Sequence, residues 1–235
     1  MAERIPTGRS FPEERLRMLL RGAAHGSTTD AVTDALREGI LSQVLPPLTW
    51  LREDEIAQAL QVSRTPVREA LRRLSDEGLT QRAANRGTVV APMTIEEILA
   101  VYAVRETLEG LAARTAAARN VPGLIDQLRS IHEQMSTVPR PDAARLAQLN
   151  LEFHRAIRRA SSNVYLERYL LQIEHAVRRF GRSTYDTPGR IEESLDEHLA
   201  IIQAIAAGES DQAESVAIAH MRKARQVRVS QLLAD

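Results

Sequence analysis

The chain has 235 residues and carries 31 basic and 31 acidic side chains, so its formal net charge is zero. This length suffices for one large or two small domains with a hydrophobic core, and 43% hydrophobic and 26% charged residues exclude global disorder. The lack of cysteine excludes disulfide scaffolds, thiolate metal sites and cysteine nucleophiles. No apolar run reaches the ~18–20 residues of a membrane helix and the N-terminus has no signal-peptide core, so we expect a cytoplasmic protein without membrane contact.

The first 92 residues have the element order of a winged helix-turn-helix. Residues 1–28 are loosely patterned, and glycine and hydroxyl residues interrupt their one short amphipathic stretch, so we expect a mobile extension there. Helical patterns then cover residues 29–41, 53–60 and 64–77, and two short strands cover 79–82 and 87–91 around a turn. Thr29 or Asp30 is expected to cap the first of these helices. The pattern predicts a winged helix-turn-helix domain with a small β wing over residues 29–92.

From residue 93 onward the pattern is helical to the end of the chain. Thr94 and Glu97 form a capping box that opens the first helix. Breaks rich in proline, glycine or serine separate helices over residues 94–119, 123–137, 141–160, 163–182, 190–207 and 209–232. Short connections between helices are typical of an antiparallel bundle. The predicted fold is therefore mainly α, with an all-helical bundle of about six helices over residues 93–235.

The helix predicted from residue 64 has the features of a DNA-reading helix. In a helix-turn-helix the second helix lies in the major groove, and its N-terminal residues contact base edges. Ser63 is suited to cap this helix, and Arg64 and Arg68, four residues apart, project from one face. Arginine matches both guanine and phosphate, and residues 61–90 hold six arginines against three acidic residues, a local charge of +3. A solvated helix face with ion pairs remains the alternative.

Residues 62–71 read VSRTPVREAL and residues 85–90 read NRGTVV. With Leu51 to Ala57, these segments closely resemble the DNA-binding domain of GntR-family transcriptional regulators, over residues 30–92. The resemblance implies that a homodimer binds double-stranded operator DNA, with the wing tip in the minor groove. The candidate DNA-binding residues are Ser63, Arg64, Thr65, Arg68, Arg72, Arg86 and Gly87.

Two positions depart from the pattern of this family. Many relatives carry an arginine that contacts DNA where this chain has Asp54, and a carboxylate there would repel phosphate. A glycine often follows the double proline where this chain has Leu48. The first departure removes one expected contact with DNA, and neither removes the core motif.

Three histidines lie on apolar faces of different predicted helices. His154 follows Asn150 by one helical turn, whereas His198 and His220 lie in the last two helices. Three helices that each bring a nitrogen or oxygen donor onto an apolar face are what a metal site in a bundle needs, and such donors suit Zn, Ni or a similar divalent ion. A helical histidine without any ligand is the commoner situation, so that alternative stays open.

The same region resembles the FCD effector domain of the FadR subfamily over residues 94–232. The resemblance rests on Val104-Arg105, Leu108-Glu109, Asn150, Phe153-His154, Glu197-His198, Ile201, Ala204-Ile205, Gly208 and His220-Met221. It implies that an aspartate and three histidines hold a divalent metal and that a small carboxylate effector completes the coordination. By position the ligands are Asn150, His154, His198 and His220. Asn150 replaces the usual aspartate, which should weaken metal binding and strengthen the attraction for an anion.

Arg105 shares the apolar stripe of its helix and should therefore point inward. A buried arginine needs a partner. That partner is either Glu109, one turn further on, or the carboxylate of an effector, which arginine binds in bidentate geometry.

The sequence predicts a ligand-responsive DNA-binding transcriptional regulator, with repression as its expected mode, and not an enzyme. One alternative is a DNA-binding protein whose metal site is purely structural and takes no effector. A metalloenzyme of the bundle type is less favoured, because such sites use several carboxylates per metal, in Glu-x-x-His pairs that this chain lacks.

Overall fold

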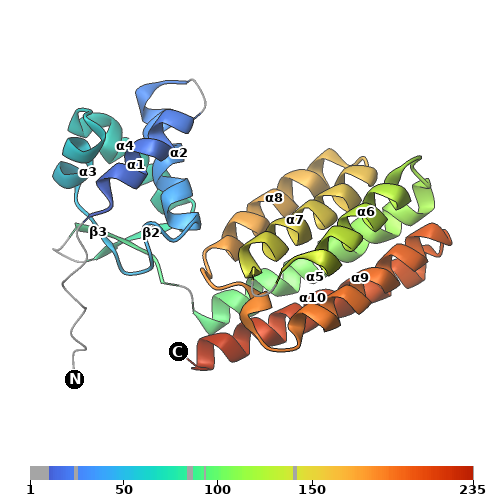
Figure 1. Ribbon diagram of the computed structural model, residues 1–235. Coiled ribbons are helices and arrows are strands. Elements are labelled where there is room, and N and C mark those ends of the chain that lie inside the picture. The colour runs from blue at the N-terminus through green and yellow to red at the C-terminus, as the bar shows by residue number, and fades with distance from the viewer. Residues whose placement is uncertain (1–10, 24–25, 84–86, 93, 140–141, 235) are drawn as a thin grey trace. The chain divides into compact units, whose positions relative to one another are not determined.

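A computed structural model describes residues 11–23, 26–83, 87–92, 94–139 and 142–234 (Figure 1). The chain divides into two compact units, one ending at Met93 and the other beginning at Thr94. Both units are mainly helical, and the N-terminal unit also contains a small antiparallel sheet. The predicted fold class is confirmed. None of the helices in these residues combines the length and the apolar character that crossing a membrane requires.

The N-terminal unit is a winged helix-turn-helix. Its helices are α1 (Glu13–Gly22), α2 (Thr28–Leu41), α3 (Glu53–Leu60) and α4 (Arg64–Asp76), and its strands are β1 (Trp50–Leu51), β2 (Thr80–Ala83) and β3 (Gly87–Val90). The strand order is β1-β3-β2, with Trp50 opposite Val89 and Thr80 opposite Val90. The short strand β1 was not predicted, because two residues are too few to show an alternating pattern.

Helix α1 belongs to this unit, which differs from the mobile extension expected for residues 1–28. It packs against α2 and α3, Leu16 is completely buried, and Arg17 donates a hydrogen bond from Nε to the Ala59 carbonyl at 2.5 Å. Residues 1–10 and 24–25 of the expected extension lie outside the described residues. Helix α2 is capped by Ser27 in a capping box with Asp30, so the expected cap at residue 29 or 30 is wrong.

The C-terminal unit is an antiparallel bundle. In the described part of this unit its six α-helices are α5 (Ile95–Arg119), α6 (Leu124–Thr137), α7 (Ala143–Ala160), α8 (Val164–Arg178), α9 (Arg190–Ala206) and α10 (Ser210–Ala234), and a 3-10 turn, η1 (Thr184–Asp186), precedes α9. Helix α5 runs through the centre and packs against α7, α8, α9 and α10 (Figure 1). The expected capping box of Thr94 and Glu97 is present. Gly110 allows α5 and α10 to approach closely, because a Cβ there would lie 2.7 Å from Cγ1 of Ile218.

Candidate functional site

Helix α4 buries one face and exposes an arginine-rich face. Val67, Ala70 and Leu74 are fully buried in the core of the N-terminal unit, whereas Arg64, Arg68, Thr65 and Arg72 lie on the exposed side. Ser63 occupies the N-cap position in extended backbone geometry, although among the described residues its hydroxyl makes no capping hydrogen bond. The sequence predicts that Arg64 and Arg68 project from one face, and both lie on the exposed side.

Each exposed arginine of α4 pairs with a carboxylate. Arg64 Nε lies 2.7 Å from Asp54 Oδ1, Arg68 Nη2 lies 2.8 Å from Glu53 Oε2, and Arg72 lies 2.7 Å from Glu69 and 3.0 Å from Asp76. These pairs are solvent-exposed, so each contributes little to stability. The arginine side chains are therefore exposed to solvent, each beside a carboxylate.

The wing carries the remaining candidates for DNA contact. Gly87 begins β3 with a φ of +103°, which favours glycine, and a Cβ there would meet no described atom within 4 Å. Gly87 therefore lies at an open position at the start of β3. Arg86 lies outside the described residues.

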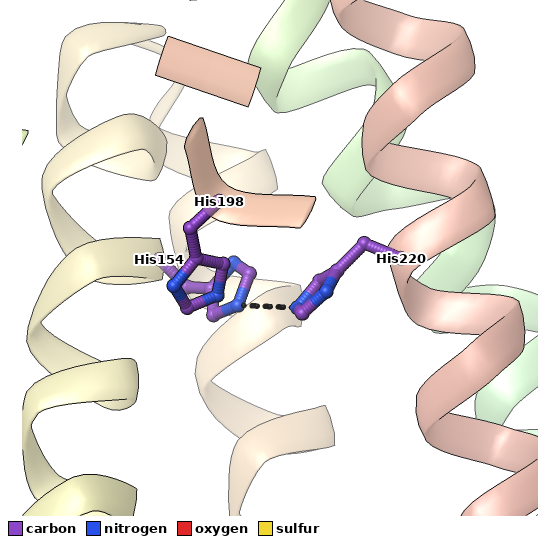
Figure 2. Close-up of side chains that lie close together, drawn as sticks. All are labelled: His154, His198 and His220. Carbon is purple, nitrogen blue, oxygen red and sulfur yellow. Dashed lines mark hydrogen bonds between the residues drawn. The ribbon is translucent and has the colours of Figure 1, made fainter. Parts of the chain in front are cut away.

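His154, His198 and His220 converge in the core of the C-terminal unit (Figure 2). They come from α7, α9 and α10 and are 3%, 0% and 3% exposed. One ring nitrogen from each lies within 4.8 Å of the others, and the Nε2 atoms of His154 and His220 are 3.2 Å apart. The ring of His198 stacks on Phe153 at 4.1 Å between centroids.

Burial keeps these imidazoles neutral. Desolvation lowers the pKa of His154 and of His198 well below the usual 6.5, and the neighbouring imidazoles lower both further. Desolvation also lowers the pKa of His220, although the Glu197 carboxylate partly opposes this shift. Among the described residues, both ring nitrogens of His198 are buried without a hydrogen-bond partner. A cluster of neutral imidazoles with unpaired nitrogens is suited to binding a cation.

Glu197, which is itself paired with Arg190, orients the His220 ring. Its Nδ1 donates to Oε2 of Glu197 at 2.5 Å, which leaves Nε2 facing His154. Arg190 donates to both oxygens of Glu197 at 2.8 and 2.7 Å. Burial alone would raise the pKa of Glu197, but the hydrogen bonds from His220 and Arg190 lower it overall, so the carboxylate is ionised. Carboxylates that hold the far nitrogen of a histidine are common around metal sites.

Asn150 is fixed by a tyrosine. It lies one turn before His154 on α7, and its Oδ1 accepts a hydrogen bond from the Tyr185 hydroxyl at 3.0 Å. The same hydroxyl is 3.0 Å from the Ser194 hydroxyl. Burial raises the pKa of Tyr185 to about 12, so the phenol stays protonated and donates. The side chain of Asn150 is thereby held on the histidine-bearing face of α7.

Arg105 is connected to the histidine cluster by Glu109, which lies between them. Its side chain is mostly buried, its guanidinium lies over the Tyr102 ring at 5.5 Å, and its Nε is 3.5 Å from Oε1 of Glu109. The other oxygen of Glu109 is 3.8 Å from Nδ1 of His154. Glu109 is therefore the internal partner that the sequence offered as one alternative, and it joins Arg105 to the histidine cluster.

Glu197 was noted only within the motif that carries the resemblance, and none of Glu197, Arg190 and Tyr185 was expected at the site. Glu197 directly precedes His198, and neighbouring residues on a helix point in different directions, so it was not expected at the same site. Glu197 follows Arg190 by seven residues, so both lie on one face of α9. This spacing was the one sequence signal that the two side chains could pair. Tyr185 lies in the 3-10 turn η1, where no helical pattern indicated a contact with α7.

Comparison with known proteins agrees with this architecture. The FCD domain family matches residues 100–223, and the family described as bacterial regulatory proteins, gntR family, matches residues 28–90. The Nta operon transcriptional regulator of Aminobacter aminovorans is 31% identical over 74% of this chain and 81% of its own length. The gluconate operon transcriptional repressor of Bacillus subtilis is 31% identical over 76% of each chain.

A solved structure shows the same fold. The E. coli protein McbR/YncC aligns over 88% of this chain and 99% of its own, with a TM-score of 0.72 and 21% identity. The curated relatives are named as transcriptional regulators or repressors, which removes the metalloenzyme alternative. The chain belongs to the GntR family of bacterial regulatory proteins and is a DNA-binding transcriptional regulator whose helical unit is an FCD domain.

Proposed function

We propose that this regulator is a homodimeric repressor whose operator affinity changes when a small organic carboxylate binds beside a divalent metal ion in the helical unit. The observation that carries the proposal is the convergence of His154, His198 and His220, with ring nitrogens within 4.8 Å of one another. An ion bound there would join α7, α9 and α10.

The chemistry of the cluster fits a divalent ion. Neutral imidazole is the form that binds metal, and burial favours that form for each histidine. Buried polar atoms without a partner are rare unless water or an ion satisfies them, and the unpartnered ring of His198 supports an ion bound at one of its two nitrogens. We propose Zn or Ni, held by the three histidines with Asn150 as an oxygen donor.

The charge of such a site favours an anionic effector. Three neutral imidazoles and a neutral amide bring no negative charge into contact with a divalent ion. The nearby carboxylates of Glu197 and Glu109 are paired with Arg190 and Arg105, so a further carboxylate would balance the charge of the ion. Arg105 brings a second positive charge close to the cluster, and guanidinium groups bind carboxylates in bidentate geometry. We therefore propose Arg105 as the residue that binds the effector, in exchange for its 3.5 Å contact with Glu109.

In the N-terminal unit we propose that α4 enters the major groove. Base and phosphate contacts come from Ser63, Arg64, Thr65, Arg68 and Arg72, and the wing contributes Arg86 and Gly87. One such helix reads only a few base pairs, so specificity requires two half-sites and a twofold-symmetric dimer. Because its operator DNA lies in the cytoplasm, we place the protein there.

The decisive experiment measures metal and carboxylate binding on the same preparations. Purified protein should hold close to one Zn or Ni ion per chain, and a panel of small mono- and dicarboxylates should raise its Tm only while metal is present. His198→Ala should lose both properties, whereas His175→Ala, on α8 outside the cluster, should keep them. Metal retained by His198→Ala would overturn the site. Metal held by the wild type without any response to carboxylates would favour a structural metal instead.

A further inference from the structure

The first turn of α3 carries an accumulation of negative charge. Glu53, Asp54 and Glu55 are its first residues. In a helix-turn-helix the first helix of the motif crosses the DNA backbone, and the N-terminus of a helix attracts phosphate through its unpaired N–H groups. Carboxylates at this position oppose that attraction.

Two of these carboxylates reach across to α4. Glu53 accepts hydrogen bonds from Arg68, through Nε at 3.1 Å and Nη2 at 2.8 Å. Asp54 lies with Oδ1 2.7 Å from Nε of Arg64. Both arginines are proposed DNA contacts. When DNA binds, each must therefore either separate from its carboxylate or contact the carboxylate and the DNA together.

The two pairs differ in accessibility. The arginine side chains are equally exposed, at 66% for Arg64 and 65% for Arg68, but Asp54 is 64% exposed whereas Glu53 is 35% exposed and holds Arg68 through two nitrogens. Arg64 is also the first residue of α4, the end of a recognition helix that lies closest to the bases. The Asp54–Arg64 pair therefore combines the more exposed carboxylate with the position closest to the DNA.

We propose that Asp54 holds Arg64 in an ion pair that must open before α4 engages DNA, and that it thereby lowers the affinity for duplex DNA that offers only phosphates. A guanine edge presents Arg64 with two acceptors in bidentate geometry, so operator binding is lowered less than non-specific binding. Asp54 is in this sense a specificity-determining residue. The inference rests on the proposed placement of α4 in the major groove.

The expected effect follows from elementary electrostatics. Opposite unit charges about 4 Å apart in water attract strongly enough to change a binding constant about fivefold. Releasing Arg64 from Asp54 should therefore tighten non-specific binding about fivefold per subunit at low salt. One additional phosphate contact per subunit should also steepen the dependence of log K on log salt by about 0.9.

The test uses a random-sequence duplex without an operator, with fluorescence anisotropy across a salt series. Asp54→Asn should bind this duplex more tightly and with a steeper salt dependence than the wild type. The matched control is Asp76→Asn, which removes an equally exposed carboxylate, 3.0 Å from Arg72, at the other end of α4. Arg72 then remains paired with Glu69 at 2.7 Å, whereas Asp54→Asn leaves Arg64 without its carboxylate. The control should change the affinity by less than about twofold.

A double-mutant cycle separates this inference from the proposal on which it rests. In an Arg64→Ala background, Asp54→Asn should lose most of its effect, because the two residues act as a pair. An equal gain from Asp54→Asn and Asp76→Asn, or an equal gain with and without Arg64, would overturn the inference. If Arg64→Ala alone left DNA affinity unchanged, the placement of α4 itself would be wrong.

Discussion

Replacing Glu197 by Gln tests how the histidine cluster is oriented. The substitution keeps the size of the side chain and an oxygen acceptor, but removes the charge that binds Nδ1 of His220 at 2.5 Å and Arg190 at 2.8 and 2.7 Å. Loss of such an outer partner weakens metal binding about 10- to 100-fold, which corresponds to about 1.4–2.7 kcal/mol.

The structure favours the upper end of this range. Arg190 is only 2% exposed, and the nearest oxygen of Glu193, its other acidic neighbour, is 3.5 Å away. With Gln at position 197, a buried guanidinium would keep its full charge near the site and repel a cation. We therefore expect Zn²⁺ to bind about 100-fold more weakly.

The assay is a titration of metal-free protein with Zn²⁺ against a competing chelator. Glu193→Gln is the matched control, because it removes a carboxylate from the preceding turn of α9 that contacts Arg190 but does not touch a histidine. Its Zn²⁺ affinity should stay close to that of the wild type. Unchanged affinity in Glu197→Gln would show that His220 needs no carboxylate to orient it and would refute the reasoning.

Further expectations concern charge, pH and packing. Asn150→Asp should tighten Zn²⁺ binding in chelator competition and weaken binding of carboxylates such as citrate, because it adds one negative charge. Weaker Zn²⁺ binding together with tighter carboxylate binding would exclude Asn150 from the site. Burial lowers the pKa of the three histidines in the folded chain. Below pH ~6.5 these histidines are therefore protonated in the unfolded chain but stay neutral in the folded chain, which favours unfolding. The Tm of metal-free protein should thus fall from pH 7 to pH 5 but not from pH 8 to pH 7. Gly110→Ala should destabilise the helical unit by about 1–3 kcal/mol in urea unfolding, since its Cβ would meet Ile218 at 2.7 Å; an unchanged midpoint would show that α5 and α10 separate easily.

The helices were predictable where periodicity and chain breaks agree. The predicted helix over residues 94–119 corresponds to α5 at Ile95–Arg119, and that over 209–232 to α10 at Ser210–Ala234. The helix predicted over residues 163–182 ends earlier, at Arg178, and the chain then forms η1. The packing of α1 was not predictable, because the burial of Leu16 depends on contacts with residues distant in sequence.

The candidate sites were predictable only in part. Spacing on single helices identified Asn150 with His154 and Arg64 with Arg68, because residues four apart share a face. The contact of Glu197 with His220 depends on how α9 and α10 are rotated against each other, which no local pattern encodes. The pairing of Asp54 with Arg64 likewise requires the turn between α3 and α4.

The histidine cluster also connects parts of the chain that are far apart in sequence. His154 and His220 are separated by 66 residues, yet their Nε2 atoms are 3.2 Å apart. In a chain without cysteine, an ion shared by these helices would act as a reversible cross-link. At a free concentration 100 times its Kd, such an ion would stabilise the folded unit by about 2.7 kcal/mol. A cell short of that metal would then hold more of the regulator unfolded and exposed to proteases, so metal supply would govern its lifetime as well as its ligand binding.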